Sequence, residues 1–325
     1  MSSRRQWIQW AGLGAASLGV MGRAWAGPFP EKPIKMIVPY APGGAADLTA
    51  RLMAEQLALA VGQPFIVENR AGGGGVIGAD LLAKAVPDGY TISFGSDPPF
   101  TINPHLHSVP YDALKSFSHV SLVANLPLVL VVNPQKMPVK NVAELIALVK
   151  ANPGKFTIAS SGNGSSGHLA AELFKHEAGI NLVHVPYKGQ APANTDMISG
   201  HVDVTFSSIG PATQHFKSGR LIPLAVSTSS RFSGLSEVPS LAETLTGFDI
   251  GVWLGLTYPA GTPQAAIDRI SQESDKILRT PAVMERFKVL GYVPVGGKPE
   301  VLTHRIESDY KRFGEIIRTN NIKGD

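Results

Sequence analysis

The chain has 325 residues, with 29 Lys and Arg, 25 Asp and Glu, and a formal net charge of +4. A chain of this length can bury a large core and usually divides into two domains. It contains no cysteine, which excludes disulfide bonds, iron–sulfur clusters and thiol catalysis. Nucleic-acid binding is also excluded, because the sequence has no run of five like charges and no basic stripe interleaved with aromatic residues.

The N-terminal segment 1–26 has the order of regions typical of an export signal. Arg4 and Arg5 precede an apolar run at 11–21, and the small residues of the Ala-Trp-Ala sequence at 24–26 suit a signal peptidase. A membrane span needs roughly 20 apolar residues, so this run is too short for an anchor. We predict a cleaved signal peptide and a periplasmic protein. The alternative is a basic N-terminal arm of a cytosolic protein, and Sec and twin-arginine export both stay open.

The first part of the remaining chain has the order of a parallel α/β sheet. Strands are predicted at 34–40, 64–69 and 90–96, and helices at 45–62 and 78–86, the first of them ending at Gly62. This βαβαβ order places helices on the faces of a parallel sheet.

A second α/β cycle follows an apolar, β-rich stretch at 121–135. Its helices are predicted at 141–154, 167–179, 191–202 and 210–220, and its strands at 156–161, 182–189, 202–208 and 221–227. Gly154 and Gly179 are expected to end the first two helices. Three helices, at 265–280, 281–291 and 299–319, complete the chain, and Pro281 suits the first turn of the second.

Two apolar stretches look like a pair of crossings between lobes. "LPLVLVVNP" at 126–134 leads into the second cycle, and "GVWLGLTYP" at 251–259 leads out of it. We therefore predict an α/β protein of two lobes joined by two crossover strands, with a ligand cleft between them. Lobe 1 comprises 27–127 and 252–325, and lobe 2 comprises 128–251. The alternative is a single continuous sheet.

The glycine-rich stretch "AGGGGVIG" at 71–78 satisfies G-x-G-x-x-G, the fingerprint of dinucleotide binding. In that motif the first glycine follows the strand almost at once, whereas five residues, 68–72, intervene here. An exported protein also meets little free NAD. We predict that this loop supports the cleft and that the protein needs no cofactor.

Motifs for catalysis and metal binding are missing from the sequence. It contains no G-x-S-x-G around a serine nucleophile, no H-E-x-x-H and no G-x-x-x-x-G-K-[ST]. His105 and His107 flank a single residue, which is too weak a pattern to assign a metal site. We expect neither enzyme chemistry nor a bound metal.

Five turns rich in glycine, serine or asparagine follow strand-like runs, and most of them precede a helix: 40–47, 69–75, 94–100, 159–168 and 206–212. Backbone N–H groups at a helix start are unpaired, and the helix dipole adds partial positive charge there, so such turns bind anions. In open α/β sheets these loops gather at the carboxyl ends of the strands, where ligands bind. The alternative, for any one of them, is that glycine only makes the turn.

The motifs, taken together and in this order, resemble the Bug-type extracytoplasmic solute receptors, the binding components of tripartite tricarboxylate transporters. The matching stretches run through nearly the whole chain after Lys32 and include "KPIKMIVPYAPGGAAD", "GQPFIVENRAGGGGVIGAD", "PDGYTI", "NPHL", "PYD", "NPGKFTIASSGNGSSGHLAAELF", "HVPYKGQAPA", "GHVDVTF" and "YPAGTP". The resemblance implies a small organic acid held between the lobes, closure of the lobes around it, and delivery of the acid to a membrane permease by a monomer.

The resemblance also implies two walls of the cleft. The first-lobe wall is Tyr40, Ala41, Pro42, Gly43, Gly44, Ala45, Asp47 and Ser96. The second-lobe wall is Ser160, Ser161, Gly162, Asn163, Gly164, Ser165, His168, Tyr187, Ser207 and Ser208.

Three of these residues also have a structural interpretation. Asp47 precedes Arg51 by four residues and can form an ion pair along the helix. His168 can be a structural histidine at a helix start, and Tyr187 can be a half-buried packing residue.

Two features depart from the expected pattern. Ala45 and Ala46 stand where a hydroxyl often occurs, and Asp97 is expected to add a negative charge at the end of a wall strand. Both disfavour a highly charged ligand such as citrate and favour a monocarboxylate, a lean dicarboxylate or an acid with an amine. The alternative functions are an exported α/β esterase or lyase that acts on a carboxylate, and an orphan ligand sensor that feeds a signalling partner.

Overall fold

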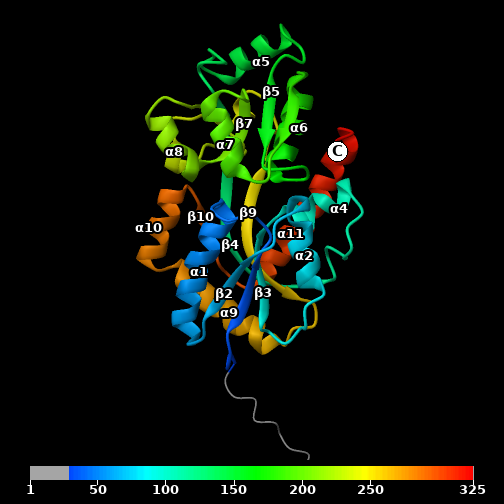
Figure 1. Ribbon diagram of the computed structural model, residues 1–325, viewed down its shortest axis with the longest axis vertical. Coiled ribbons are helices and arrows are strands. Elements are labelled where there is room, and N and C mark those ends of the chain that lie inside the picture. The colour runs from blue at the N-terminus through cyan, green and yellow to red at the C-terminus, as the bar shows by residue number, and fades with distance from the viewer. Residues whose placement is uncertain (1–28, 325) are drawn as a thin grey trace, which may run out of the picture.

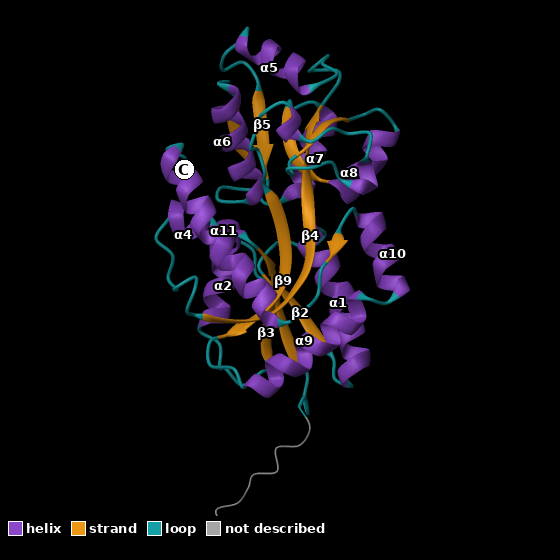
Figure 2. Ribbon diagram, turned by 180° about the vertical axis from the view of Figure 1, so that it is seen from behind, coloured by secondary structure: helices purple, strands orange, loops and turns teal. Residues whose placement is uncertain are grey.

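The computed structural model of the protein describes residues 29–324. Two α/β lobes lie one above the other along the long axis of the molecule (Figure 1). Two long strands, β4 (Phe117–Val132) and β9 (Gly251–Pro259), run lengthwise through its centre, as the view from behind in Figure 2 also shows.

The lower lobe contains the first α/β cycle. Its strands are β1 (Ile34–Val38), β2 (Phe65–Asn69) and β3 (Thr91–Ser96), and its helices are α1 (Ala45–Val61), α2 (Val76–Ala83), α9 (Gln264–Leu278) and α10 (Pro281–Leu290). β1 pairs in parallel with both β2 and β3, as the βαβαβ order predicts. β9 then pairs antiparallel with β3.

The upper lobe contains the second cycle. Its strands are β5 (Thr157–Ser160), β6 (Val183–Pro186), β7 (Val204–Ser208) and β8 (Ile222–Val226), and its helices are α5 (Val142–Lys150), α6 (Ser166–Ala178), α7 (Gln190–Ser199) and α8 (Ile209–Lys217). β5 pairs in parallel with β6 and β7.

β4 belongs to both lobes. Its residues 117–127 pair antiparallel with β9, and its residues 128–132 pair with β7 and β8. The strands therefore form one hydrogen-bonded path, in the order β2-β1-β3-β9-β4-β7-β5-β6, with β10 (Val293–Pro294) and β8 attached to β4. A continuous path and a two-lobed architecture coexist because the two halves of one strand serve different lobes.

Each lobe has its own hydrophobic core, and the last helix, α11 (Pro299–Thr319), reaches both. Leu302 and Ile306 pack with Trp253 in the lower lobe, whereas Phe313 and Ile317 pack into the main cluster of the upper lobe. In Figure 1 the end of α11 lies beside α4 (Asn103–Leu106) and reaches the level of α6. The residue boundaries given above for the lobes stay a prediction.

Glycine and proline positions in the sequence predicted most helix ends correctly. Gly62 and Gly179 end α1 and α6 in left-handed conformations with φ of 77° and 59°, and Pro281 lies in the first turn of α10. The prediction that α5 ends at Gly154 was wrong, because the helix ends at Lys150. Pro153 disfavours helical conformation in the residue before it, so the chain leaves the helix earlier.

Two further features differ from the expectations. β4 begins at Phe117, well before the apolar stretch taken as the crossing. The short helices α3 (Pro98–Thr101) and α4 were not predicted, since prolines interrupt any helical periodicity there.

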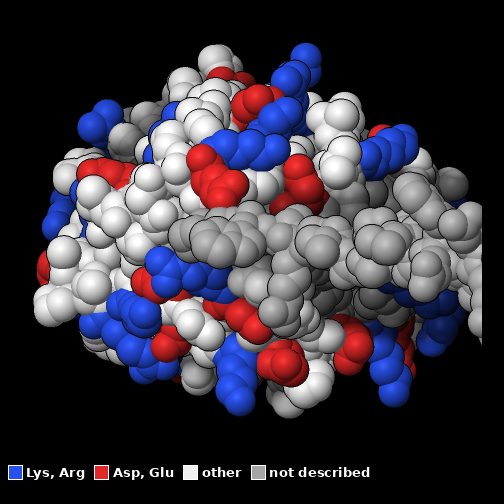
Figure 3. Space-filling view, turned by 90° about the horizontal axis from the view of Figure 1, so that it is seen from below, with Lys and Arg blue, Asp and Glu red and all other residues white. Residues whose placement is uncertain are grey.

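The surface seen from below carries basic and acidic side chains interspersed rather than in blocks of one sign (Figure 3). Within residues 29–324, no helix combines the length and the apolar character needed to cross a membrane. The predicted signal peptide at 1–26 lies outside the described residues.

Candidate functional site

The first predicted wall is the loop between β1 and α1. Gly44 is the N-cap residue of α1 and offers no side-chain cap, so the first turn presents backbone N–H groups. Asp47 is buried, with an exposed fraction of 2%. Its Oδ2 accepts from the Gly43 backbone N–H at 2.9 Å and its Oδ1 accepts from Asn69 Nδ2 at 2.8 Å. Asp47 therefore shapes the loop.

The ion pair expected along this helix is present. Arg51 Nη2 lies 3.0 Å from Asp47 Oδ1. Burial acts to raise the pKa of Asp47, but the hydrogen bonds from Arg51, Gly43 and Asn69 outweigh it and hold the pKa below its usual value. The carboxylate is thus negative and engaged by the protein.

Tyr40 and Ser96 come together at the carboxyl ends of β1 and β3. The Tyr40 hydroxyl and Ser96 Oγ lie 2.7 Å apart. Burial raises the pKa of Tyr40 well above its usual value, so the phenol is neutral and can donate. A Cβ at Gly75 would lie 3.0 Å from this hydroxyl, so glycine lets the 69–75 loop close over it.

The glycine run 72–75, which overlaps the G-x-G-x-x-G pattern, approaches the other lobe at Gly74. Residues 72–75 all have positive φ, between 55° and 138°, a run that only glycine tolerates. A Cβ at Gly74 would lie 2.9 Å from Asn103 Nδ2 and 3.0 Å from the Asn163 carbonyl oxygen. The loop therefore faces protein atoms of the other lobe.

The second predicted wall is the loop between β5 and α6. Ser160 Oγ lies 2.7 Å from His184 Nε2 and 3.2 Å from the Gly162 backbone nitrogen. Ser165 caps α6 by accepting from the His168 backbone N–H at 3.1 Å. These contacts fix a compact turn, of which residues 161–163 are partly exposed.

Two histidines brace this turn from within the lobe. His168 Nδ1 accepts from the Gly164 backbone N–H at 3.2 Å, and its ring stacks on His184 with centroids 4.2 Å apart. His168 has an exposed fraction of only 2%. This geometry favours the structural interpretation of His168.

Tyr187 follows β6, and Ser207 and Ser208 end β7, so they lie at the ends of the two strands that flank β5. The Tyr187 backbone N–H donates to the Ser160 carbonyl oxygen at 3.0 Å, and its hydroxyl donates to Asp196 Oδ2 at 2.7 Å. Burial, together with that bond, raises the pKa of Tyr187 to about 12. Ser207 Oγ donates to Asn194 Oδ1 at 3.1 Å, and Ser208 ends β7. These groups surround the turn of the second wall.

The two lobes are bridged near the second wall by residues that the site prediction omitted. Asn103 Nδ2 donates to the Gly74 carbonyl oxygen at 3.2 Å and to the Gly164 carbonyl oxygen at 3.4 Å. Ser166 Oγ donates to Asp97 Oδ2 at 2.9 Å. Asn103 lies in "NPHL" and Ser166 in "SSGNGSSGH", so the motifs that carry the resemblance already contained both.

A separate surface hollow of about 560 Å³ lies between α6, β6 and the segment after α11. Its lining includes His168, His184 and Glu172, but no residue of the predicted first wall. We place the candidate site at the facing loops, because Asp97, which directly follows the first-wall residue Ser96, is bonded there to Ser166 in the loop of the second wall.

The site lacks the arrangement of a hydrolase or a metal centre. Ser160 and His184 are within hydrogen-bond distance, yet Ser160 is fully buried and its hydroxyl also contacts Gly162, so it is not presented as a nucleophile. Within residues 29–324, no group of three or more His, Cys, Asp or Glu side chains is placed to hold a metal ion.

Comparison with known proteins decides the family. Residues 49–322 match the model of the tripartite tricarboxylate transporter family receptor, TctC. The chain belongs to this receptor family. Protein BugT of Bordetella pertussis is 36% identical over 315 residues, covering 96% of each chain. A protein from the tcbD-tcbE intergenic region of a Pseudomonas species is 39% identical over 291 residues, covering 89% of this chain and 86% of that one.

Solved structures of similar proteins have the same overall fold. The periplasmic binding protein BugD is 32% identical, with a TM-score of 0.85; the match covers 91% of this chain and 99% of BugD. R. palustris Rpa4515 with adipate is 31% identical, with a TM-score of 0.87 and the same coverage. MatC from Rhodopseudomonas palustris with bound malate is 28% identical, with a TM-score of 0.84 and coverage of 89% and 100%.

This receptor is therefore a solute-binding protein with the two-lobed fold of periplasmic binding proteins, and not an enzyme. Its family implies a small-molecule ligand, a transporter partner and a periplasmic location.

Proposed function

We propose that this receptor captures a small organic carboxylate between its lobes and delivers it to the membrane permease of a tripartite tricarboxylate-type transporter. The observation that carries the proposal is that each lobe presents a helix start after a turn that contains glycine, at α1 and at α6, and that the turn before α6 is tied to the lower lobe through Asn103 and Asp97. Such helix starts favour anions without a bound cation. The ligands named for two similar structures, adipate and malate, are both small dicarboxylates.

The charge expected at Asp97 needs a correction that bears on the ligand. The sequence predicted an added negative charge there, but Asp97 is fully buried and burial raises its pKa to about 7. Near neutral pH this carboxyl is negative for only part of the time. A dicarboxylate is therefore disfavoured less than the sequence alone indicated.

A thermal-shift screen of organic acids tests the proposal. Mono-, di- and tricarboxylates, amino acids and neutral analogues such as the matching diamides are compared on the purified chain. A cognate acid at a hundred times its dissociation constant should stabilise the protein by roughly 2.7 kcal/mol, seen as a higher melting temperature. Stabilisation by the neutral analogues and by none of the acids would refute the carboxylate class.

Gly162→Val tests the second wall. Gly162 has φ of 127°, and a Cβ there would lie 3.1 Å from the Tyr187 carbonyl oxygen, so a branched side chain strains the turn and projects into it. We expect a folded protein whose affinity for the acid found in the screen falls by at least ~1.4 kcal/mol, about tenfold. Calorimetry measures the affinity, and circular dichroism checks the fold. Affinity equal to that of the wild type in a folded variant would show that the wall is misplaced.

A further inference from the structure

Asp97 is a carboxyl group sealed at the contact between the lobes. It directly follows β3 in the lower lobe and has an exposed fraction of 0%. Its Oδ2 accepts from Ser166 Oγ, which lies in the first turn of α6 in the upper lobe. Its Oδ1 is buried and has no hydrogen-bond partner. The hydrogen bond from Ser166 therefore exists only while the two lobes touch.

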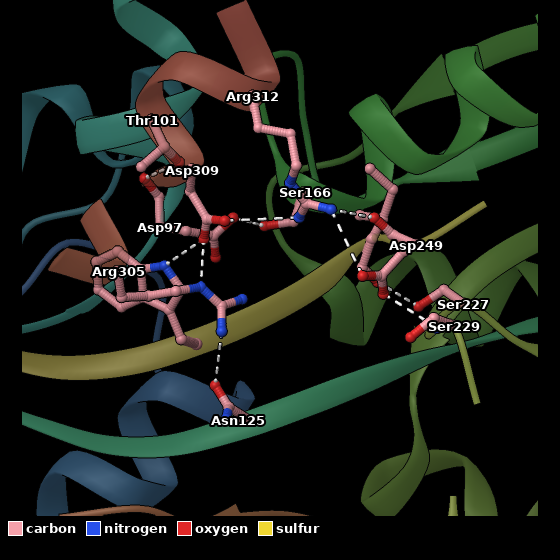
Figure 4. A network of polar contacts seen from close by, with 12 residues as sticks. Asp97, Thr101, Asn125, Ser166, Ser227, Ser229, Asp249, Arg305, Asp309 and Arg312 are labelled. Carbon is pink, nitrogen blue, oxygen red and sulfur yellow. Dashed lines mark hydrogen bonds and ion pairs between the residues drawn. The ribbon is translucent and has the colours of Figure 1, made fainter. Parts of the chain in front are cut away.

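The charged groups around Asp97 do not neutralise it. On α11, Asp309 and Arg305 face it, but Arg305 Nε binds Asp309 Oδ2 at 2.6 Å (Figure 4). Arg312, further along α11, lies 3.5 Å from Asp309 Oδ1 and 3.5 Å from Asp249 Oδ2.

Two more titratable groups interact with Asp97 or with the α3 helix that follows it. From the loop after β1, Tyr40 is neutral and its pKa is raised further by the charge of Asp97. From β4, His119 packs against Phe100 of α3, and burial lowers its pKa to about 4, so it carries no charge near neutral pH. The principal effect on Asp97 is burial, which raises its pKa to about 7 against the hydrogen bond from Ser166, with a further rise from Asp309.

We propose that Asp97 is a proton-binding site that couples closure of the two lobes to the uptake of one proton. When the lobes part, Ser166 withdraws and the carboxyl meets water, where an aspartate ionises near pH ~4. When the lobes close, an ionised carboxylate with one hydrogen bond is left in a dry interface, which is costly. The closed form therefore favours the neutral acid. This inference rests on the proposed function, in which closure traps the ligand.

The direction of the pH dependence follows from the two pKa values. Because the pKa of Asp97 is higher in the closed form, protonation stabilises that form. The closed fraction rises as the pH falls through about 7 and levels off below pH ~4, where both forms are protonated. Between these limits the ratio of closed to open protein changes by up to tenfold per pH unit, the slope for one proton.

A distance measurement tests the coupling without a known ligand. The chain has no cysteine, so Leu59→Cys and Ala151→Cys, at exposed positions of the lower and upper lobes, give two labelling sites. Spin labels at these sites report the distance between the lobes from pH 5 to pH 8.5, both without ligand and with L-malate as a probe. We expect the closed fraction to rise as the pH falls.

Asp97→Asn is the decisive variant, because asparagine keeps an acceptor for Ser166 and carries no charge. Its closed fraction should not change with pH and should exceed that of the wild type at pH 8. Asp80→Asn is the matched control: Asp80 Oδ2 accepts from Lys84 Nζ within α2, so this variant should keep the pH dependence of the wild type.

The outcomes separate the inference from the proposed function. If wild type and Asp97→Asn show the same closed fraction at every pH, the proton coupling is wrong. If L-malate closes both proteins equally at pH 5 and pH 8, the coupling is also wrong, and the receptor function stands. A pH-dependent closed fraction without a ligand, lost only in Asp97→Asn, supports the coupling even if L-malate does not bind.

Discussion

Gly164→Ala should hold the lobes apart and weaken ligand binding by about 2 kcal/mol, roughly thirtyfold. A Cβ at Gly164 would lie 2.0 Å from Asn103 Oδ1, well inside van der Waals contact. Asn103 is fully buried and is held by the carbonyl oxygen of Gly74, so it cannot turn away without losing that bond. The added methyl group therefore opposes the closed state. Calorimetry with the acid found in the screen measures the loss.

The matched control for this variant is Gly179→Ala. Gly164 and Gly179 have similar positive φ values of 70° and 59°, so alanine costs a similar backbone strain at each position. A Cβ at Gly179 would meet nothing within 4 Å. We expect Gly179→Ala to lower the stability of the fold slightly and to bind as the wild type does. If both variants bind equally well, the contact between Asn103 and Gly164 has no part in closure.

A second variant separates a steric cause from a lost hydrogen bond. Asn103→Ala removes the side chain that would collide and also removes the bridge between Gly74 and Gly164. The double variant Gly164→Ala with Asn103→Ala should bind better than Gly164→Ala alone, because the collision is relieved. Such coupling between neighbours is what a double-mutant cycle measures.

The sequence predicted the fold well wherever local chemistry decides it. The helix starting at Ala45 was placed from its apolar periodicity and from Gly62, which alone can take the left-handed conformation at its end without strain. The last helix was predicted at 299–319, and α11 occupies the same residues. These elements depend on nearest neighbours in the chain, which a single sequence reveals.

The long strand β4 was harder to predict because its first half is chemically mixed. His119, Ser121 and Asn125 interrupt the apolar pattern, so the sequence pattern placed the crossing only from Leu126 onward. These polar residues are tolerated because β9 pairs with that whole half. The strand is thus specified by a partner far away in the sequence.

In the candidate site, too, the features set by local sequence were predicted, and the features set by distant residues were not. The loops were found from their glycines, but the role of each side chain depends on contacts between distant residues. Asp47 was assigned to the wall, and a local ion pair with Arg51 was weighed against it. Its bond to Asn69, across 22 positions, could not be read from the sequence. The burial of Asp97, which changes its charge, likewise requires the other lobe.

Asp309→Ala should lower the free energy of unfolding by about 3 kcal/mol. Asp309 is buried on α11, and its Oδ2 accepts from Arg305 Nε at 2.6 Å and from Trp253 Nε1 at 3.2 Å. Alanine leaves the indole N–H of the fully buried Trp253 without its acceptor and leaves Arg305 without its counter-charge. Arg305 also donates to Asn125 on β4, so the substitution weakens the contacts between α11 and the two central strands (Figure 4). Denaturant unfolding measures the loss.

Glu307→Ala and Asp309→Asn complete this experiment. Glu307 is exposed on the same helix, so its removal should change the free energy of unfolding by less than about 0.5 kcal/mol. Asp309→Asn keeps an acceptor for Trp253 but removes the charge. The free energy of unfolding that it loses should therefore lie between the losses of Glu307→Ala and Asp309→Ala. This order separates the bond to the indole from the ion pair, because only the alanine variant loses both. A free energy of unfolding for Asp309→Ala within about 0.5 kcal/mol of the wild type would mean that α11 is held by its apolar contacts alone, through Leu302 and Phe313.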